Sequence, residues 1–200
     1  MRFFLIALFF PASLFSQNLD INSLRDINVN RNKSLDGTFK AFTNSAAPIA
    51  YGTPAVLFGI GLLKKDSAIR RKALYIGTTV LSAAIFTEIL KYSINRPRPF
   101  VTYPVIEKMT EGGGPSFPSG HTSDAFSFAT SVSIAYPKWY IIVPSYAWAS
   151  VVAYSRMDLG VHYPSDVLAG AIIGAGTAYL NCKIIKWLNK KKIGGRKKLN

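Results

Sequence analysis

The sequence predicts an all-α protein: a polytopic bundle of transmembrane helices, with about five spans after a signal peptide or six with an uncleaved N-terminal span. Three long stretches of the 200-residue chain carry no charged side chain: Ala41–Leu63, Trp139–Ser155 and Val167–Cys182. Residues 73–90 carry only Glu88. A helix that crosses the hydrocarbon core needs about 20 mostly apolar residues, and several of these stretches meet or approach that length. A soluble helical enzyme with buried helices is the alternative.

The chain opens with the run MRFFLIALFFPASLFSQN. Arg2 precedes a short apolar region, and the small residue Ser16 follows it, a pattern typical of a signal peptide over residues 1–16. An uncleaved anchor is the alternative, and in both cases the next residues begin outside the cytoplasm.

Residues 17–40 mix polar and apolar side chains, and the apolar ones are loosely spaced for a helix. We expect an extracytoplasmic amphipathic segment here, with a helix lying at the membrane surface. An ordinary surface segment is the alternative.

Residues 41–188 form the predicted membrane domain, and residues 189–200 form a basic cytoplasmic tail. The segment KKDSAIRRK, Lys64–Lys72, has five cations and one acid, and Lys183–Asn200 has eight cations and no acid. Cytoplasmic loops carry such an excess of Lys and Arg, so both segments are expected inside. The predicted spans are Phe42–Leu63, Ala73–Tyr92, Ser119–Tyr136, Trp139–Tyr154 and Val167–Ile185.

This topology places the Pro- and Gly-rich segment 93–119 and the segment 155–166 together on the outer side. The net charge of +14 is also typical of nucleic-acid binding. Because the cations cluster at the ends of apolar runs, we expect membrane lipids and no nucleic acid as partners. One cysteine, Cys182, excludes an intramolecular disulfide and a four-cysteine zinc site, and with two histidines a metal would need carboxylate ligands.

The first candidate site stretch is KYSINRPRP, Lys91–Pro99. The planar fork of Arg suits bidentate contact with a phosphate, and Lys adds a point charge. The two prolines restrict the backbone on either side of Arg98. Anchoring of Lys91, Arg96 and Arg98 at the membrane interface is the alternative.

The second stretch is PSGH, Pro118–His121, at the start of the third predicted span. Gly120 lets the backbone approach an anion closely, and the unpaired N–H groups of a helix N-terminus attract negative charge. His121 then lies in the first turn, facing the anion. A structural helix cap with a surface histidine is the alternative.

The third stretch is SRMDLGVHYPSD, Ser155–Asp166. Arg156 supplies a further cation. Pro164 is a natural first helical residue, which puts Asp166 in the first turn, within reach of one nitrogen of His162. Such a bond fixes the tautomer and leaves the other nitrogen as a nucleophile. A surface ion pair is the alternative.

Together the three stretches supply what phosphoryl transfer needs: cations, a nucleophile and an acid for the leaving oxygen. Their spacing resembles the three-part signature of the type 2 phosphatidic acid phosphatase superfamily, which also includes bacterial non-specific acid phosphatases and vanadium haloperoxidases. The matching parts are Lys91 with Arg98–Pro99, then Pro118–His121, then Ser155–Arg156 with His162 and Asp166, without a gap or substitution.

The resemblance implies a role for each residue. His162 would attack phosphorus and form a phosphohistidine, Asp166 would orient it, and His121 would protonate the leaving alkoxide and then activate water. The phosphate oxygens would be held by Lys91, Arg98, Ser119, Gly120 and Arg156. No metal or other cofactor would be required.

The leading interpretation is an integral-membrane lipid phosphate phosphatase that hydrolyses phosphomonoester or diphosphate groups of lipids. We expect it in the bacterial cytoplasmic (inner) membrane, multi-pass, with its site facing the periplasm or exterior. A soluble secreted acid phosphatase of the same superfamily is the main alternative, against which the charge-free spans argue. Two further alternatives are a vanadate-dependent haloperoxidase and a non-enzymatic basic protein of the membrane surface. The non-enzymatic protein leaves the three motifs unexplained.

Overall fold

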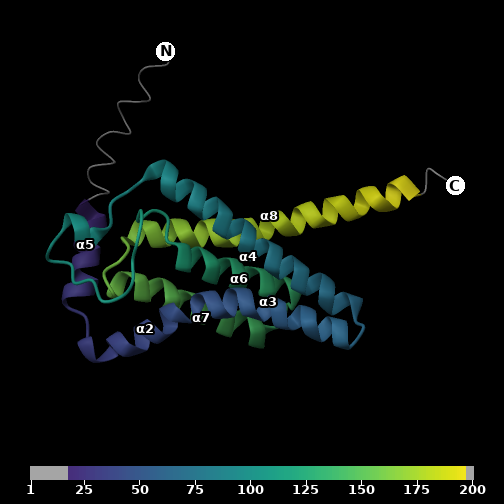
Figure 1. Cartoon of the computed structure of the whole chain (residues 1–200), viewed down its shortest axis with the longest axis horizontal. Coiled ribbons are helices and arrows are strands. Elements are labelled where there is room, and N and C mark those ends of the chain that lie inside the picture. Colours follow the sequence, from purple (N-terminus) through teal and green to yellow (C-terminus); the bar gives the residue numbers. More distant parts are fainter. Residues whose placement is uncertain (1–17, 197–200) are drawn as a thin grey trace, which may run out of the picture.

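The computed structural model describes residues 18–196, which are mostly helical and contain no strand (Figure 1). A first helix covers 18–29. The elements that follow are η1 (Lys33–Leu35), α2 (Asp36–Asn44), α3 (Ala46–Leu63), α4 (Ser67–Ile94), α5 (Pro99–Thr102), α6 (Gly120–Ala135), α7 (Trp139–Asp158) and α8 (Pro164–Arg196). The predicted signal peptide lies outside the described residues.

Three described segments are long and apolar enough to cross a membrane: Lys33–Leu63, Ser67–Thr102 and Pro164–Leu188. Together with the all-helical architecture they confirm the predicted fold class. The predicted count of five spans stays a prediction, as do the four predicted segment boundaries of the chain. The other two long helices are α6, with 16 residues, and α7, with 20.

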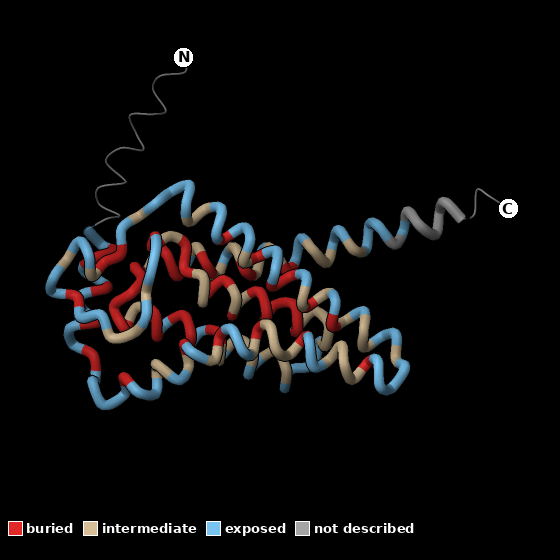
Figure 2. The backbone as a smooth tube through the Cα atoms, in the orientation of Figure 1, coloured by how far each residue is buried: buried red, intermediate tan, exposed pale blue. Residues whose placement is uncertain are grey.

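Helix α6 lies inside the bundle and packs against α3, α4, α7 and α8. The buried residues run along the middle of the bundle (Figure 2). The tight contact with α8 depends on two glycines: a Cβ at Gly170 would lie 2.6 Å from the Ser119 carbonyl oxygen, and one at Gly174 would lie 2.4 Å from that of Ser123. Small residues four apart let two membrane helices approach closely. This contact fixes the start of α6 beside the start of α8.

The boundaries of several helices differ from those of the predicted spans. The first predicted span divides at Ser45 into α2 and α3. Helix α7 continues past Tyr154 to Asp158, so Arg156 lies in its last turn and not in a loop. Helix α4 ends at Ile94 and is followed by Asn95, which has a left-handed backbone conformation. Pro137 and Lys138, which separate the third and fourth predicted spans, lie between α6 and α7.

The helix 18–29 is present and one side of it packs on the protein, while its position at the membrane surface stays a prediction. Leu24 is fully buried with Ile106 and Tyr163. The Asn28 amide donates to the carbonyl oxygens of Glu107 (3.1 Å) and Asp158 (2.7 Å). These contacts tie the helix to the segment 93–119 and to the end of α7.

Candidate active site

The candidate site residues gather at one end of the bundle, where α4 and α7 end and α6 and α8 begin (Figure 1). A hydrogen bond from the Ser119 N–H to the Asp166 carbonyl oxygen, 3.0 Å long, joins the start of α6 to the first turn of α8. Because this bond and the glycine contacts hold the two helices together, the second and third motifs have a fixed relative position.

His162 and Asp166 form a buried pair. The distance between His162 Nδ1 and Asp166 Oδ2 is 3.4 Å, and the two residues are 1% and 0% exposed. Pro164 begins α8 and Asp166 lies in its first turn, as predicted. The carboxylate also accepts from Ser116 Oγ, from the Tyr163 N–H (2.9 Å) and from Arg96 (2.7 Å). With Nδ1 on the carboxylate, the Nε2 atom of His162 is the nitrogen left for other chemistry.

Arg98 faces that other nitrogen. Its Nη1 lies 3.3 Å from His162 Nε2. Three carbonyl oxygens hold the guanidinium: those of Gly114 at 3.0 Å, Val161 at 2.9 Å and Gly113 at 2.8 Å. A side chain at Gly112 would collide with it, since a Cβ there would lie 2.9 Å from Nη1. The Gly-rich run 112–114 therefore serves to cradle Arg98.

The pKa of His162 is lowered to about 4, chiefly by burial and also by the positive charges of Arg156 and Arg98, against the opposing effect of the hydrogen bond to Asp166 and of its charge. The imidazole is therefore neutral at neutral pH. A neutral imidazole has the lone pair that a nucleophile needs.

Arg156 is the second buried guanidinium. Its Nη1 donates to Thr43 Oγ1 at 2.6 Å and its Nη2 to the Glu111 carbonyl oxygen at 3.1 Å. Within the part of the chain that the structure describes, its Nε has no hydrogen-bond partner. Buried donors are normally paired, so a free one beside a cluster of cations suits an anionic ligand.

Lys91, Gly120 and His121 complete the arrangement. Lys91 forms an ion pair with Glu88 (3.1 Å), and its Nζ would lie 3.5 Å from a Cβ at Gly120. His121 lies in the first turn of α6, within electrostatic range of Lys91, Arg98, Arg156 and His162. Ser119 is fully buried just before this helix and accepts a hydrogen bond from Thr122. The structure thus brings every predicted site residue into one region.

Arg96, the other arginine of the first motif, does not join Lys91, Arg98 and Arg156 as a cation of the candidate anion site. It turns to Asp20, Ser165 and Asp166 instead. Sequence reasoning also missed Thr43, Ser116 and Asp20. Asp20 and Thr43 reach the site from distant parts of the chain, and Ser116 lies just before the second motif but contacts Asp166, 50 residues later.

The cations of the candidate site can bind an anion such as a phosphate, and His162 can attack it as a nucleophile. Three cations and a helix N-terminus surround a neutral histidine whose other nitrogen is held by a carboxylate. Among residues 18–196 no group of three or more His, Cys, Asp or Glu side chains could hold a metal ion. The chemistry that these residues themselves offer is nucleophilic attack with charge stabilisation by fixed cations.

Comparison with known proteins shows similar sequences and a similar fold. The chain is 35% identical over 106 residues to the undecaprenyl-diphosphatase of Sulfolobus acidocaldarius, covering 51% of this chain and 50% of that protein. It is 35% identical over 86 residues to the lipid A 4'-phosphatase of Bacteroides thetaiotaomicron, covering 43% and 38%. The chain thus spans half or less of the length of these two relatives.

A solved structure shares the fold over most of the chain. The crystal structure of Aquifex aeolicus LpxE superposes with a TM-score of 0.70 at 27% identity, over 82% of this chain and 95% of that one. The sequence profile of the PAP2 superfamily matches residues 72–190, which include all three motifs. The chain therefore belongs to the PAP2 superfamily.

Proposed function

We propose that this protein is an integral-membrane lipid phosphate phosphatase that works through a phosphohistidine intermediate. One observation carries the proposal: His162 is fixed by Asp166 through one nitrogen and presents the other to Arg98, within a group of buried cations. A histidine arranged in this way is a nucleophile directed at a bound phosphoryl group.

The first step forms a bond between His162 Nε2 and phosphorus and breaks the bond from phosphorus to the lipid oxygen. The negative charge of the bound phosphate favours the protonated form of His121. His121 gives its proton to the lipid oxygen, which leaves as an alcohol or, from a diphosphate, as a lipid phosphate. In the second step water attacks the phosphohistidine, His121 takes up one proton from the water, and inorganic phosphate leaves. Lys91, Arg98 and Arg156, with Ser119 and Gly120, hold the phosphoryl oxygens as charge redistributes among them. Neither step uses a metal ion.

The membrane character of the chain supports a lipid substrate. The candidate site lies at one end of a bundle with three segments long and apolar enough to cross a membrane, and we expect a lipid headgroup to be in reach there. The relatives are an undecaprenyl-diphosphatase and a lipid A phosphatase, so phosphates on long-chain lipids are the proposed substrate class. A soluble secreted acid phosphatase fits the same motifs but leaves the three apolar segments without a purpose.

The proposed location is the bacterial cytoplasmic membrane, with the site on the periplasmic or outer side. The supporting feature is charge: the segment 64–72, rich in Lys and Arg, lies where α3 ends and α4 begins, at the opposite end of the bundle from the start of α8 (Figure 1). Cytoplasmic ends carry such cations.

The test is phosphate release by the protein purified in detergent from a panel of lipid phosphates, with soluble phosphate esters of matched leaving groups as controls. We expect release from at least one lipid phosphate at a kcat/KM well above that for the soluble esters, in the presence of a chelator. Vanadate should inhibit, since it can adopt the five-coordinate geometry of the phosphoryl transition state. Soluble esters hydrolysed as fast as every lipid would contradict a lipid substrate, and loss of activity on chelation, restored by a divalent metal, would contradict the metal-independent mechanism.

A further inference from the structure

Arg96 and Arg98 of the first motif lie on opposite sides of the His162–Asp166 pair. Arg98 is held by backbone carbonyls against His162 Nε2. Arg96 lies on the other side of the His162–Asp166 pair, where its Nη1 donates to Asp166 Oδ1 at 2.7 Å. The Asp166 carboxylate is therefore held between Arg96 on one oxygen and His162, Ser116 and a backbone N–H on the other.

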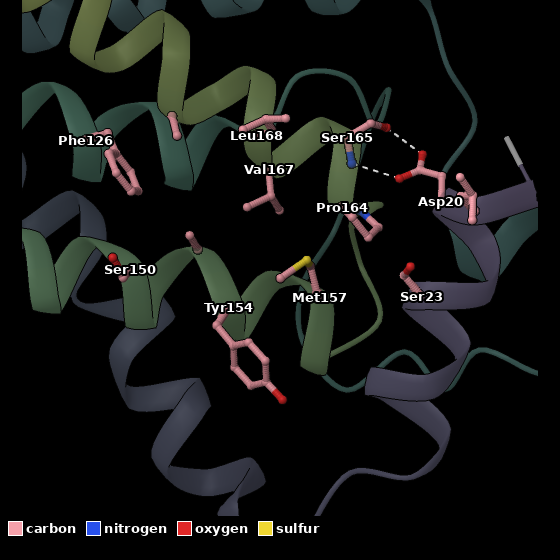
Figure 3. Close-up of a pocket in the computed structure, with 13 residues that line it drawn as sticks. Asp20, Ser23, Phe126, Ser150, Tyr154, Met157, Pro164, Ser165, Val167 and Leu168 are labelled. Atoms are coloured by element: carbon pink, nitrogen blue, oxygen red, sulfur yellow. Dashed lines mark hydrogen bonds between the residues drawn. The ribbon is translucent and has the colours of Figure 1, made fainter. Parts of the chain in front are cut away.

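Arg96 is fixed from its own far side by Asp20, which belongs to the helix 18–29. Arg96 Nη2 donates to Asp20 Oδ2 at 2.7 Å, and its guanidinium stacks on the Tyr163 ring with 3.7 Å to the centroid. Figure 3 shows Asp20 reaching Ser165 with both carboxylate oxygens, one accepting from the Ser165 N–H (2.8 Å) and one from its hydroxyl. Ser165 also accepts from Arg96, at 2.7 Å.

These contacts form a row of alternating charges, Asp20, Arg96 and Asp166, which ends at the neutral imidazole of His162. Asp20 is 9% exposed and Asp166 is 0% exposed. Ion pairs away from water are strong and sensitive to geometry, because little solvent screens them. A shift of Arg96 therefore alters both the position and the effective charge of the carboxylate that holds the nucleophile.

We propose that Asp20 and Arg96 are positioning residues of the active site, and that the helix 18–29 takes part in catalysis by holding Arg96 on Asp166. Neither side chain contacts the reacting atoms. Arg96 balances part of the Asp166 charge and fixes its Oδ1, so that Oδ2 stays directed at His162. Asp20 keeps Arg96 in place. The inference deepens the proposed function and rests on it for the role of His162.

The direction of the electrostatic effect follows from the groups that face His162. They are Asp166 from α8, Arg156 from α7, Arg98 before α5 and His121 from α6. Removal of the Arg96 charge leaves the Asp166 charge less balanced, which favours the protonated form of His162. Arg96→Met should therefore raise the pKa of His162, whereas Arg96→Lys, which keeps the charge, should leave it close to that of the parent.

The chain contains two histidines, so His121→Gln leaves His162 as the single histidine for NMR. The protein is purified through a tag without histidine, labelled on histidine nitrogen and titrated in detergent. In this background Arg96→Met should raise the pKa of His162 by about one unit. A pKa that is unchanged or lower would overturn the role given to Arg96. The titration needs no turnover, so it decides this inference even if the proposed function fails.

Asp20 is tested by kinetics in the native-histidine protein, on whichever phosphate ester the parent hydrolyses. Asp20→Asn should lower kcat about tenfold and leave KM near the parent value, since Asp20 does not contact the phosphate. The matched control is Asn28→Ala, which removes the other anchor of the same helix without touching Arg96. Glu107→Gln, which weakens the ion pairs to Arg31 and Lys33, is a second control.

Both control variants should keep kcat within about twofold of the parent. If they lower kcat as much as Asp20→Asn does, docking of the helix alone accounts for the effect and the positioning role is wrong. Thermal unfolding of each variant in detergent identifies those that fold, and comparison is made among them. A parent that hydrolyses no phosphate would contradict the proposed function instead.

Discussion

Both ends of the bundle contain many cations, but the two ends differ in whether cationic side chains are buried or exposed. At the end where α6 and α8 begin, the charged side chains of Arg98, Arg156 and Asp166 are buried and have hydrogen-bond partners. At the other end the side chains of Lys64, Arg71 and Lys138 are exposed. Both ends would look alike in a count of Lys and Arg.

The difference separates charges that hydrogen bonds within the protein stabilise from charges that remain exposed to water. A buried charge is costly unless hydrogen bonds and opposite charges offset the loss of water. Three carbonyl oxygens and the loop 112–114 are arranged around one guanidinium, Arg98. The exposed cations need no such arrangement, and the effect suited to them is contact with anionic lipid and control of topology.

The strongest test of the comparison asks whether the two ends lie on opposite sides of the membrane. In a Cys182→Ser background, Val105→Cys marks the end with the buried charges and Ser67→Cys marks the other, and both positions are exposed. An impermeant thiol reagent should label Val105→Cys in intact cells and Ser67→Cys only after lysis. Labelling of Ser67→Cys but not Val105→Cys in intact cells would reverse the topology.

The second prediction concerns the proposed acid, His121. General acid catalysis typically contributes about 10²–10⁴-fold and is needed only when the leaving oxygen is basic. His121→Ala should therefore slow hydrolysis of an alkyl phosphate by that factor and spare the first step on an aryl phosphate with an acidic phenol. Single-turnover mixing with both esters measures this, and equal losses on the two esters would contradict the assignment.

The third prediction compares one arginine from each end. Arg98→Lys keeps the charge but cannot reproduce a fork that donates to three carbonyl oxygens, so kcat/KM should fall about 10²–10³-fold. Arg71→Lys, at the exposed end, should change kcat/KM by less than about twofold. A similar loss from both substitutions, measured on the same ester, would mean that burial does not distinguish the two kinds of arginine.

The fourth prediction concerns the contact that brings the second and third motifs together. A Cβ at Gly174 would meet the Ser123 carbonyl oxygen at 2.4 Å, whereas a Cβ at Gly176 would meet nothing within 4 Å. Gly174→Ala should destabilise the protein by about 1–3 kcal/mol, and Gly176→Ala should be neutral or slightly stabilising. Thermal unfolding in detergent measures both, and equal stability of the two variants would show that α6 and α8 can separate without cost.

Sequence alone predicted the parts of the site that depend on local geometry. Pro164, Asp166 and His162 lie within one turn and its preceding loop, so their spacing was sufficient to pair them. The same holds for His121 in the first turn after Gly120. The apolar stretches predicted the helices, because a segment that crosses a membrane must satisfy its own backbone hydrogen bonds and an α-helix does so.

What sequence could not give depends on contacts between distant segments. Nothing in RPRP shows that Arg96 and Arg98 face opposite sides of the His–Asp pair, since the difference is set by Asp20, 76 residues earlier. Thr43 reaches Arg156 across 113 residues. The loosely helical spacing of apolar residues in the segment 17–40 predicted a helix at the membrane surface, and only the buried residues Ile21, Leu24 and Asn28 of the structure reveal that this helix packs on the protein.

The central claim is that His162 carries the phosphoryl group between the two steps, and trapping that group tests it most directly. His121→Ala is mixed with an aryl phosphate, since this variant should form the phosphohistidine quickly and hydrolyse it slowly. The account predicts a burst of phenol of one equivalent per enzyme, and an acid-labile phosphate that mass spectrometry places on the peptide containing His162. His162→Ala should show neither burst nor adduct. A burst from His162→Ala with the phosphate on His121 would reverse the two roles, and turnover with no adduct in either variant would contradict the account.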